Sequence, residues 1–563
     1  MIWFLFDKDG DNMKSNKLKK NTFMQGAFIA TFGIVLSKIL GMIYVIPFYS
    51  IIGEQGGALY GYAYNIYSIF LSISTAGIPL AISSITSEYN TLGQYANKER
   101  TFHIAKKYLS IIGIICFIIL FIFAKDIGYL IIGNNTGGNS INDIAFVIRV
   151  ISFSILIVPT LSVYRGYLQG HKFITPTSIS QVLEQIIRVS IIIIGSFVAV
   201  KVFNLSIRYA VACALLGATV GSLFSYLYLV FVRRKNKDNL NIEEDKVSNI
   251  TSKEILKKII LCAFPFVLCD VGKSLFNSVD TFFVVRTLTD LGYQTDVAES
   301  VMSVISTWGN KLNMIVIAIG TGFAVSLIPN MTASFVKKDY KDINIKINQT
   351  FKTLLFITIP MTLGLSFLAT PIWNVFYGAS TYGPIVFRFS IIVALVTVLL
   401  SASQVIALTF KEYKILLISV LAGLILNALC DVPLMLLIDR LGGYAFYGAT
   451  LSTCLGHILT ITMILNLIKK KYKVSLKDSF ITGFKTILFT GIMLLVLTLL
   501  TYIVPINDLG RIKSLLIVVL YALIGAIIYL LLSYKAGLIT NIFGKDIFDK
   551  IKGKLHLKKR VIK

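Results

Sequence analysis

The chain has 563 residues, of which 56% are hydrophobic and only 15% are charged. A soluble domain carries about 25% charged residues, so this composition excludes most classes of soluble enzyme. The net charge of +26 is typical of nucleic-acid-binding proteins, but the basic residues are concentrated between long apolar stretches, which argues against nucleic acid as a partner.

Fourteen apolar stretches follow one another along the chain, and each is long enough to cross a bilayer. A helix needs about 20 apolar residues to cross about 30 Å of hydrocarbon. The stretches lack the two-residue alternation of membrane barrel strands, so we predict an all-α polytopic membrane protein with 14 transmembrane helices. The predicted spans are 22–46, 61–83, 107–124, 144–164, 177–200, 209–232, 259–285, 301–329, 351–370, 384–409, 415–438, 444–468, 480–504 and 513–533.

Lysine and arginine residues are distributed unequally between the two sets of alternating loops. The termini and the loops on the same side hold 39 of the 54, whereas the intervening loops hold seven. Cytoplasmic segments of membrane proteins are enriched in basic residues. This asymmetry predicts that both termini are cytoplasmic.

The longest predicted cytoplasmic loop follows the sixth span and separates two sets of six spans with the same orientation. Such parallel repeats are common in transporters. The first twelve residues are too acidic and too short for a signal peptide and are assigned no role. The predicted parts are a cytoplasmic N-terminal segment (1–21), an N-lobe (22–232), a linker (233–253), a C-lobe (254–468), two additional spans (469–534) and a basic cytoplasmic tail (535–563).

Charged residues inside the spans are costly and are candidate functional residues. Lys38 in the first span and Lys311 in the eighth have no acidic residue three or four positions away. Each must therefore find an anion or lose its proton. Together they predict an anion-binding chamber, with snorkelling of the lysines to the membrane interface as the alternative. Glu184 and Arg188 are four positions apart on one helix face and are predicted to form an ion pair.

Oxygen-bearing side chains gather in the second set of spans. Asn427 and Asp431 lie four positions apart on one predicted helix face, and Asp280 and Thr450 could complete a cluster. Hard monovalent or divalent cations take such oxygen ligands. A hydrogen-bond network between helices is the alternative interpretation.

Three segments resemble the oligosaccharidyl-lipid flippase branch of the MOP exporter superfamily. They are RGYLQGHKFITPTSISQVLEQIIRV (165–189), SKILGMIYVIPF (37–48) and GGALYGYAYNIYSIFLSISTAGIPLAIS (56–83). Within that branch the chain resembles the MurJ-like lipid II flippases and the stage V sporulation protein B group of Gram-positive bacteria. The resemblance implies a V-shaped, MATE-like fold of two six-helix lobes around a cationic cavity, with the last two helices forming a groove for a polyprenyl tail.

The resemblance also implies roles for individual residues. Lys38 and Lys311 match basic cavity positions that hold arginine in relatives, and lysine keeps the charge without bidentate geometry. Asp280, Asn427, Asp431 and Thr450 match the sodium ligands of some members. Other basic positions of the family are not kept, since Tyr44 stands where some members carry a second basic residue. Arg149 and Arg188 are candidates to supply the missing charge.

The implied function is a flippase that moves a polyprenyl-pyrophosphate-linked saccharide, lipid II for peptidoglycan synthesis, across a bacterial plasma membrane by alternating access. Sodium or the membrane potential would drive transport, because the chain has no phosphate-binding loop of the G-x-x-x-x-G-K-[ST] type. The alternatives are a flippase for a capsule, teichoic-type or spore-cortex precursor, and a cation-coupled exporter of small molecules. No loop is long enough for a catalytic domain, so the chain is not expected to be an enzyme. Cell-wall synthases are the expected protein partners.

Overall fold

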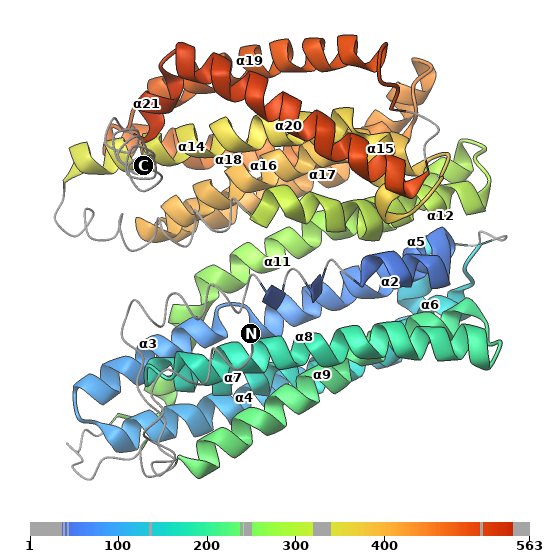
Figure 1. The fold of residues 1–563 in the computed structure, drawn as a ribbon. Helices are drawn as coiled ribbons and strands as arrows, with labels where there is room; N and C mark the ends of the chain where they lie inside the picture. The colour runs from blue at the N-terminus through green and yellow to red at the C-terminus, as the bar shows by residue number, and fades with distance from the viewer. Residues whose placement is uncertain are drawn as a thin grey trace, which may run out of the picture. The chain divides into compact units, whose positions relative to one another are not determined.

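A computed structural model describes residues 44–133, 138–236, 250–318, 339–506 and 510–543, together with residues 36–37, 40–41 and 240. Helices, including short 3₁₀ and π segments, are the only regular elements among these residues (Figure 1). Twelve described segments are long and apolar enough to cross a membrane. They correspond to the predicted second to seventh and ninth to fourteenth spans, which confirms the all-α membrane class. Of the two other predicted spans, 22–46 falls largely outside the described residues, and 301–329 is described only as far as residue 318.

The chain divides into two compact units. Unit 1 comprises residues up to Ile51, Ile66–Lys125 and Ala145–Val271, and unit 2 comprises Ile52–Asn65, Asp126–Ile144 and the chain from Gly272 onward. Two long helices contribute to both units. They are α2 (Val45–Thr75), which is interrupted by the left-handed Gly53 at φ 63°, and α11 (Ser252–Asp290), which continues through Pro265.

The remaining helices of unit 1 pack around an aromatic core. Phe102 lies 5.0 Å from Tyr164 and 4.8 Å from Tyr167, measured between ring centroids. Two glycines of the RGYLQG segment bring α7 (Val158–Gly170) close to α3 (Ile78–Thr91), because a Cβ on either glycine would come within 2.7 Å of a backbone oxygen of α3. The helices are α3 (Ile78–Thr91), α4 (Tyr95–Ile122), α6 (Ile141–Ser152), α7 (Val158–Gly170), α8 (Ile174–Phe197) and α9 (Ile207–Lys235).

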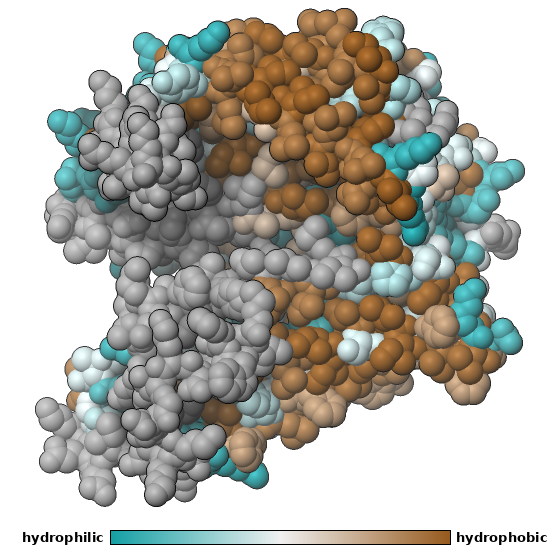
Figure 2. All heavy atoms as spheres, in the orientation of Figure 1, coloured by the Kyte–Doolittle hydropathy of each residue, from teal (hydrophilic) through white to brown (hydrophobic). Residues whose placement is uncertain are grey.

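Unit 2 is a bundle in which α19 (Lys477–Thr501) and α20 (Arg511–Lys535) lie against α14 (Tyr340–Phe367) and α15 (Ala369–Phe376) at one edge (Figure 1). The exposed faces of α19 and α20 are apolar, as the brown surface in Figure 2 shows, and they suit contact with lipid. The helices are α5 (Ala124–Ile132), α12 (Thr295–Ser303), α14 (Tyr340–Phe367), α15 (Ala369–Phe376), α16 (Gly383–Thr409), α17 (Tyr413–Arg440), α18 (Phe446–Tyr472), α19 (Lys477–Thr501), α20 (Arg511–Lys535) and α21 (Leu538–Phe543).

The boundaries of these units differ from those of the predicted lobes. Residues 52–65 and 126–144 belong to the predicted N-lobe but pack within unit 2, and the first half of α11 packs within unit 1. The division into an N-lobe, a linker, a C-lobe and two additional spans stays a prediction.

Candidate functional site

Lys38 lies outside the described residues, whereas Lys311 is half-buried in the helical segment 309–318. A π-helical turn, Val304–Trp308, comes directly before this segment. Such turns occur frequently at functional sites. Trp308 is buried and packs so closely on Gly57 that a Cβ there would lie 2.0 Å from the indole Nε1. The backbone that carries Lys311 is therefore anchored one turn earlier.

The predicted ion pair between Glu184 and Arg188 is confirmed, and the structure adds a third member. Arg188 Nη2 lies 2.8 Å from Glu184 Oε1, and Arg165 Nη2 lies 2.8 Å from Glu184 Oε2. Arg165 also donates to Ser180 through its Nε, at 3.1 Å. Two guanidinium groups share one carboxylate, so this cluster of α7 and α8 keeps a net charge of +1. Sequence reasoning missed Arg165 because it is 19 residues from Glu184 and was assigned to a loop.

Arg149 occupies a different environment on the exposed face of α6. Its Nε donates to the carbonyl oxygen of Phe121 at 3.2 Å, and its guanidinium lies 5.6 Å from the centroid of the Phe121 ring. These contacts hold the side chain against the end of α4. A substrate-binding role for Arg149 stays a prediction, and its contacts suit a capping role at the end of that helix.

The predicted oxygen cluster lies in unit 2, where α11, α17 and α18 meet. Gly423 and Gly456 bring α17 and α18 together, since a Cβ on either would lie 2.5–2.6 Å from the carbonyl oxygen of the other. Small residues permit such close packing between membrane helices. Thr453 Oγ1 lies 3.3 Å from both Asp280 Oδ1 and Asn427 Oδ1. Three helices thus bring polar groups to one buried point.

Asp431 is the residue of this cluster that most clearly needs a further partner. It is completely buried one turn beyond Asn427, and neither of its carboxylate oxygens has a hydrogen-bond partner among the described residues. An isolated buried carboxylate is strongly disfavoured unless a cation or a proton compensates it. Thr450 is also buried on α18. The oxygen-rich donor set therefore fits a sodium ion, which Asp280, Asn427, Asp431 and a threonine of α18 would hold.

Two members of this cluster were missing from the sequence prediction. Thr453 joins Asp280 to Asn427, and Ser452 donates to both the backbone oxygen and Oδ1 of Asn427, at 2.6 and 2.9 Å. The sequence places Thr450, Ser452 and Thr453 within one helical turn. Which of these hydroxyls faces Asn427 depends on the rotation of α18, which spacing alone does not determine.

A second polar cluster joins segments from distant parts of the chain within unit 2. We call Glu54, Asn139, Glu299, Ser300 and Ser380 the acidic clasp. The buried Glu299 carboxylate accepts the backbone N–H of Asn139 at 2.9 Å and its Nδ2 at 3.0 Å. Glu54 accepts hydrogen bonds from Ser300 Oγ and, at 2.6 Å, from Ser380 Oγ. The hydrogen bonds of the acidic clasp thus involve four segments of unit 2, namely α2, the residues before α6, α12 and the loop between α15 and α16.

We expect the stability of unit 2 to depend on the protonation of Glu299. Burial raises the pKa of Glu299 to about 7, the hydrogen bonds from Asn139 oppose part of this increase, and Asp296 and Asp143 add smaller increases. The folded state therefore keeps a proton that the unfolded chain releases near its usual value of 4.5. Stability should fall by on the order of 2–3 kcal/mol as the pH rises from about 4.5 to about 7, and then level off. Melting temperatures across this range will measure the effect.

Glu299→Gln should flatten that pH dependence, because glutamine mimics the protonated acid. Asp290→Asn, at an exposed position at the end of α11, is the control and should melt as the wild type does across this pH range. An unchanged slope in Glu299→Gln would contradict this assignment.

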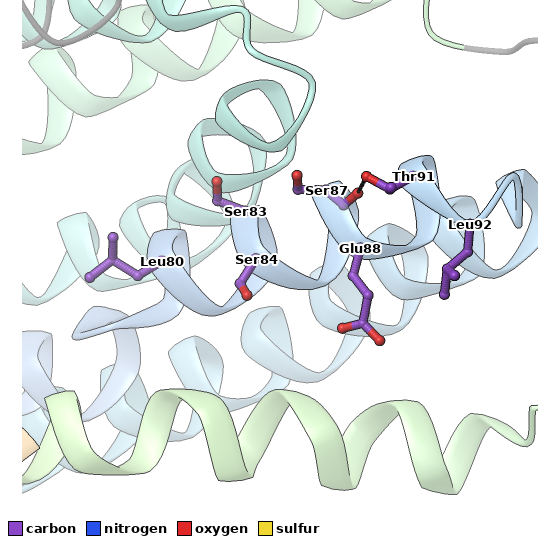
Figure 3. Close-up of a pocket in the computed structure, with 7 residues that line it drawn as sticks. All are labelled: Leu80, Ser83, Ser84, Ser87, Glu88, Thr91 and Leu92. Carbon is purple, nitrogen blue, oxygen red and sulfur yellow. Dashed lines mark hydrogen bonds between the residues drawn. The ribbon is translucent and has the colours of Figure 1, made fainter. Parts of the chain in front are cut away.

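A hydroxyl-lined cavity of about 580 Å³ lies along α3 in unit 1. Ser83, Ser87 and Thr91 point to one side of the helix, whereas Ser84 and Glu88 point to the other (Figure 3). Glu88 is paired with Lys258 of α11, with 2.6 Å between Oε1 and Nζ. Hydroxyl groups both donate and accept hydrogen bonds, as the hydroxyl groups of a sugar do. This face suits contact with a sugar.

An apolar groove of about 360 Å³ is formed by α14, α15, α19 and α20 in unit 2. Its lining is almost entirely hydrocarbon, and four glycine or alanine positions leave room along its length. The lining residues are Phe356, Ile357, Pro360, Met361, Gly364, Leu365, Leu368, Ile372, Met493, Leu497, Val518, Tyr521, Ala522, Gly525, Ala526, Tyr529 and Leu530. The groove therefore suits a hydrocarbon chain.

Comparison with known proteins supports the family predicted from the sequence. A family model described as polysaccharide biosynthesis protein matches residues 23–335, more than half of the chain. The chain belongs to this polysaccharide biosynthesis protein family. Among curated members, it is 31% identical to lipid II flippase MurJ of Bacillus subtilis over 539 residues, which cover 93% of this chain and 97% of the relative.

Two further similarities extend this family assignment. The chain is 24% identical to stage V sporulation protein B of Bacillus subtilis over 371 residues, covering 64% of this chain and 68% of the relative. A solved structure titled as lipid II flippase MurJ in an inward closed conformation superimposes with a TM-score of 0.65 and 19% identity. It covers 91% of this chain and 99% of the solved one, so the family member has a MurJ-like fold.

Proposed function

We propose that this protein is a flippase that moves a polyprenyl-pyrophosphate-linked saccharide, most directly lipid II, from the cytoplasmic to the outer leaflet. The observation that carries the proposal is the apolar groove between α14, α15, α19 and α20. A lipid-linked saccharide has a long hydrocarbon tail that must stay in an apolar environment while its head group crosses the membrane. The relationship to lipid II flippase MurJ along almost the whole chain supports the same function.

The polar part of the substrate requires basic and hydroxyl groups inside the spans. Lys311, together with Lys38, would attract the pyrophosphate as point charges. The Arg165–Glu184–Arg188 cluster adds a net positive charge in unit 1. The hydroxyl-lined face of α3 would receive the saccharide.

Alternating access needs an energy source that distinguishes two conformations. The cluster of Asp280, Asn427, Asp431 and the α18 threonines is the proposed sodium site, and sodium bound there would tie α11, α17 and α18 together. The membrane potential adds about 2.3 kcal/mol per charge for each 100 mV. Both termini would face the cytoplasm, and cell-wall synthases on the outer face would consume the product.

A second candidate substrate is a spore-cortex or other lipid-linked oligosaccharide precursor. The similarity to stage V sporulation protein B favours it. Depletion of the protein in its host distinguishes the substrates, because the untransported precursor should accumulate in the inner leaflet. Accumulation of lipid II supports the first substrate, and accumulation of another lipid-linked saccharide supports the second. If no lipid-linked saccharide accumulates, the flippase proposal is wrong.

Removal of the charge at Lys311 should abolish complementation of a strain that lacks its lipid II flippase. The pyrophosphate loses a positive partner at a poorly solvated position, where electrostatic interactions are stronger than in water. Lys311→Arg should complement, because the charge remains. Lys513→Ala removes an exposed lysine at the start of α20 and should also complement. Full complementation by Lys311→Ala at normal expression would show that this lysine only reaches toward the interface.

A further inference from the structure

Lys273 lies in the membrane-spanning part of α11, far from both ends of the span. In the predicted span 259–285 it is 14 residues from one end and 12 from the other, which is about 18–21 Å at 1.5 Å per residue. A lysine side chain is too short to carry its charge over that distance to an interface. The half-buried ammonium group therefore needs a partner inside the membrane.

No carboxylate of the spans is that partner. Asp270 precedes Lys273 by three residues, a spacing that permits an ion pair on one helix face, but the two residues form none. Within the described part of the chain, Lys273 takes part in no ion pair and no hydrogen bond. Every aspartate and glutamate of the predicted spans belongs to this part, so no other acidic residue of a span is available to it.

The contacts between α11 and α18 place Lys273 beside His457. The two helices run in opposite directions, because Asp280 contacts Thr453 and, one turn away on each helix, the Phe276 ring lies 4.5 Å from the His457 ring between centroids. Lys273 occupies the next turn on the same face of α11, and its charge acts on His457. His457 is only 4% exposed, and its Nδ1 has no hydrogen-bond partner among the described residues. Two neighbouring polar groups thus have no partner from the protein.

We propose that Lys273 and His457 bind a phosphate group of the transported lipid. Lys273 supplies the positive charge, and His457 donates from Nδ1, which carries the proton in one of the two tautomers of a neutral imidazole. The contact passes directly or through a water molecule. This inference rests on the proposed flippase function and adds a head-group site in unit 2 to the charge of Lys311.

The same two helices carry the candidate cation cluster. Asp280 follows Lys273 by seven residues, about 10 Å along α11. Negative charge on Asp280 and Asp431 would repel a phosphate at that distance, and a cation held by these carboxylates would remove the repulsion. Head group and cation should therefore strengthen each other's binding, and linkage makes the effect equal in both directions.

The test measures equilibrium binding of radiolabelled undecaprenyl pyrophosphate to the full-length protein in nanodiscs, in sodium chloride and in choline chloride of equal ionic strength. The wild type should bind more tightly in sodium, by on the order of tenfold. Lys273→Met keeps the apolar stem and should weaken binding about tenfold and reduce the difference between the salts, whereas Lys273→Arg should retain both. His457→Phe keeps the ring against Phe276 and should weaken binding about threefold.

Lys257→Met is the matched control, because Lys257 is an exposed lysine of the same helix, 16 residues before Lys273. It should bind the lipid as the wild type does. Thermal unfolding in choline separates binding from folding. Removal of an unpaired ammonium group should leave the melting temperature of Lys273→Met unchanged or raised, whereas the loss of a structural ion pair would lower it.

Equal affinity of Lys273→Met and Lys257→Met overturns the proposal, and so does a lowered melting temperature of Lys273→Met. Wild-type binding by His457→Phe overturns the two-residue site, and equal wild-type affinity in the two salts overturns its coupling to the cation cluster. In these cases the wild type still binds the lipid, and the flippase function stands. A wild type that binds no undecaprenyl pyrophosphate overturns both the site and the flippase function.

Discussion

Gly364→Phe should abolish transport while leaving the protein folded. Gly364 lines the apolar groove, and a Cβ at this position would meet no heavy atom within 4 Å. A phenylalanine would therefore enter the groove without displacing a neighbour and would exclude a hydrocarbon tail. Each buried CH₂ group contributes about 0.8 kcal/mol, so the loss of two such groups already weakens binding about tenfold. Complementation of a flippase-deficient strain, together with lipid II transport in proteoliposomes, measures the effect.

The matched control for this experiment is Gly491→Phe. Gly491 is an exposed helical glycine of α19 that also has no heavy atom within 4 Å of an added Cβ, but it does not line the groove. Both substitutions replace glycine within a membrane helix, so they share their effects on helix propensity. Normal transport by Gly364→Phe would show that the tail does not use the groove. Equal loss in both variants would point to a general effect on folding.

Asp431→Asn should remove the stabilisation of the protein by sodium. In the wild type, the melting temperature should be higher in sodium chloride than in choline chloride at the same ionic strength, because sodium would compensate the buried carboxylate. Saturation at 100 times the dissociation constant would add about 2.7 kcal/mol. Asp439→Asn, two helical turns farther along α17, should keep the full difference between the two salts.

The sign of the Asp431→Asn effect in choline separates the two interpretations of the cluster. A site built for a cation leaves the carboxylate uncompensated without sodium, so the neutral asparagine should then raise the melting temperature. A purely structural hydrogen-bond network should instead lose stability on substitution in either salt. Equal melting of the wild type in both salts would contradict a sodium site and leave a proton or the membrane potential as the driving force.

The sequence was sufficient to predict the membrane class, because the cost of leaving backbone groups unpaired in hydrocarbon makes every long apolar stretch a helix. The ion pair between Glu184 and Arg188 could also be predicted, since residues four apart share a helix face. Arg165 could not, because its contact with Glu184 requires the turn that folds α7 back against α8. The packing of residues 52–65 with unit 2 likewise depends on contacts between positions more than 200 residues apart, such as Asn65 and Thr281.

The candidate cation cluster shows how far spacing alone can go. Asn427 and Asp431 share a face of one helix, so their proximity follows from the sequence. The rotation of α18 decides which threonine meets them, and the structure puts Thr453 in contact with Asn427. The apolar groove was predicted only through a resemblance, because a lining made of ordinary leucine, methionine and alanine residues has no sequence signature.

The acidic clasp has a consequence for biosynthesis. Glu54 is synthesised 246 residues before Ser300 and 326 residues before Ser380. At about 5–20 residues per second, the ribosome needs roughly 12–50 s to reach the first of these partners. During that interval Glu54 and later Asn139 are synthesised, and their native contacts do not yet exist. A chain truncated after the sixth span should therefore lack these contacts and expose both segments to membrane quality control.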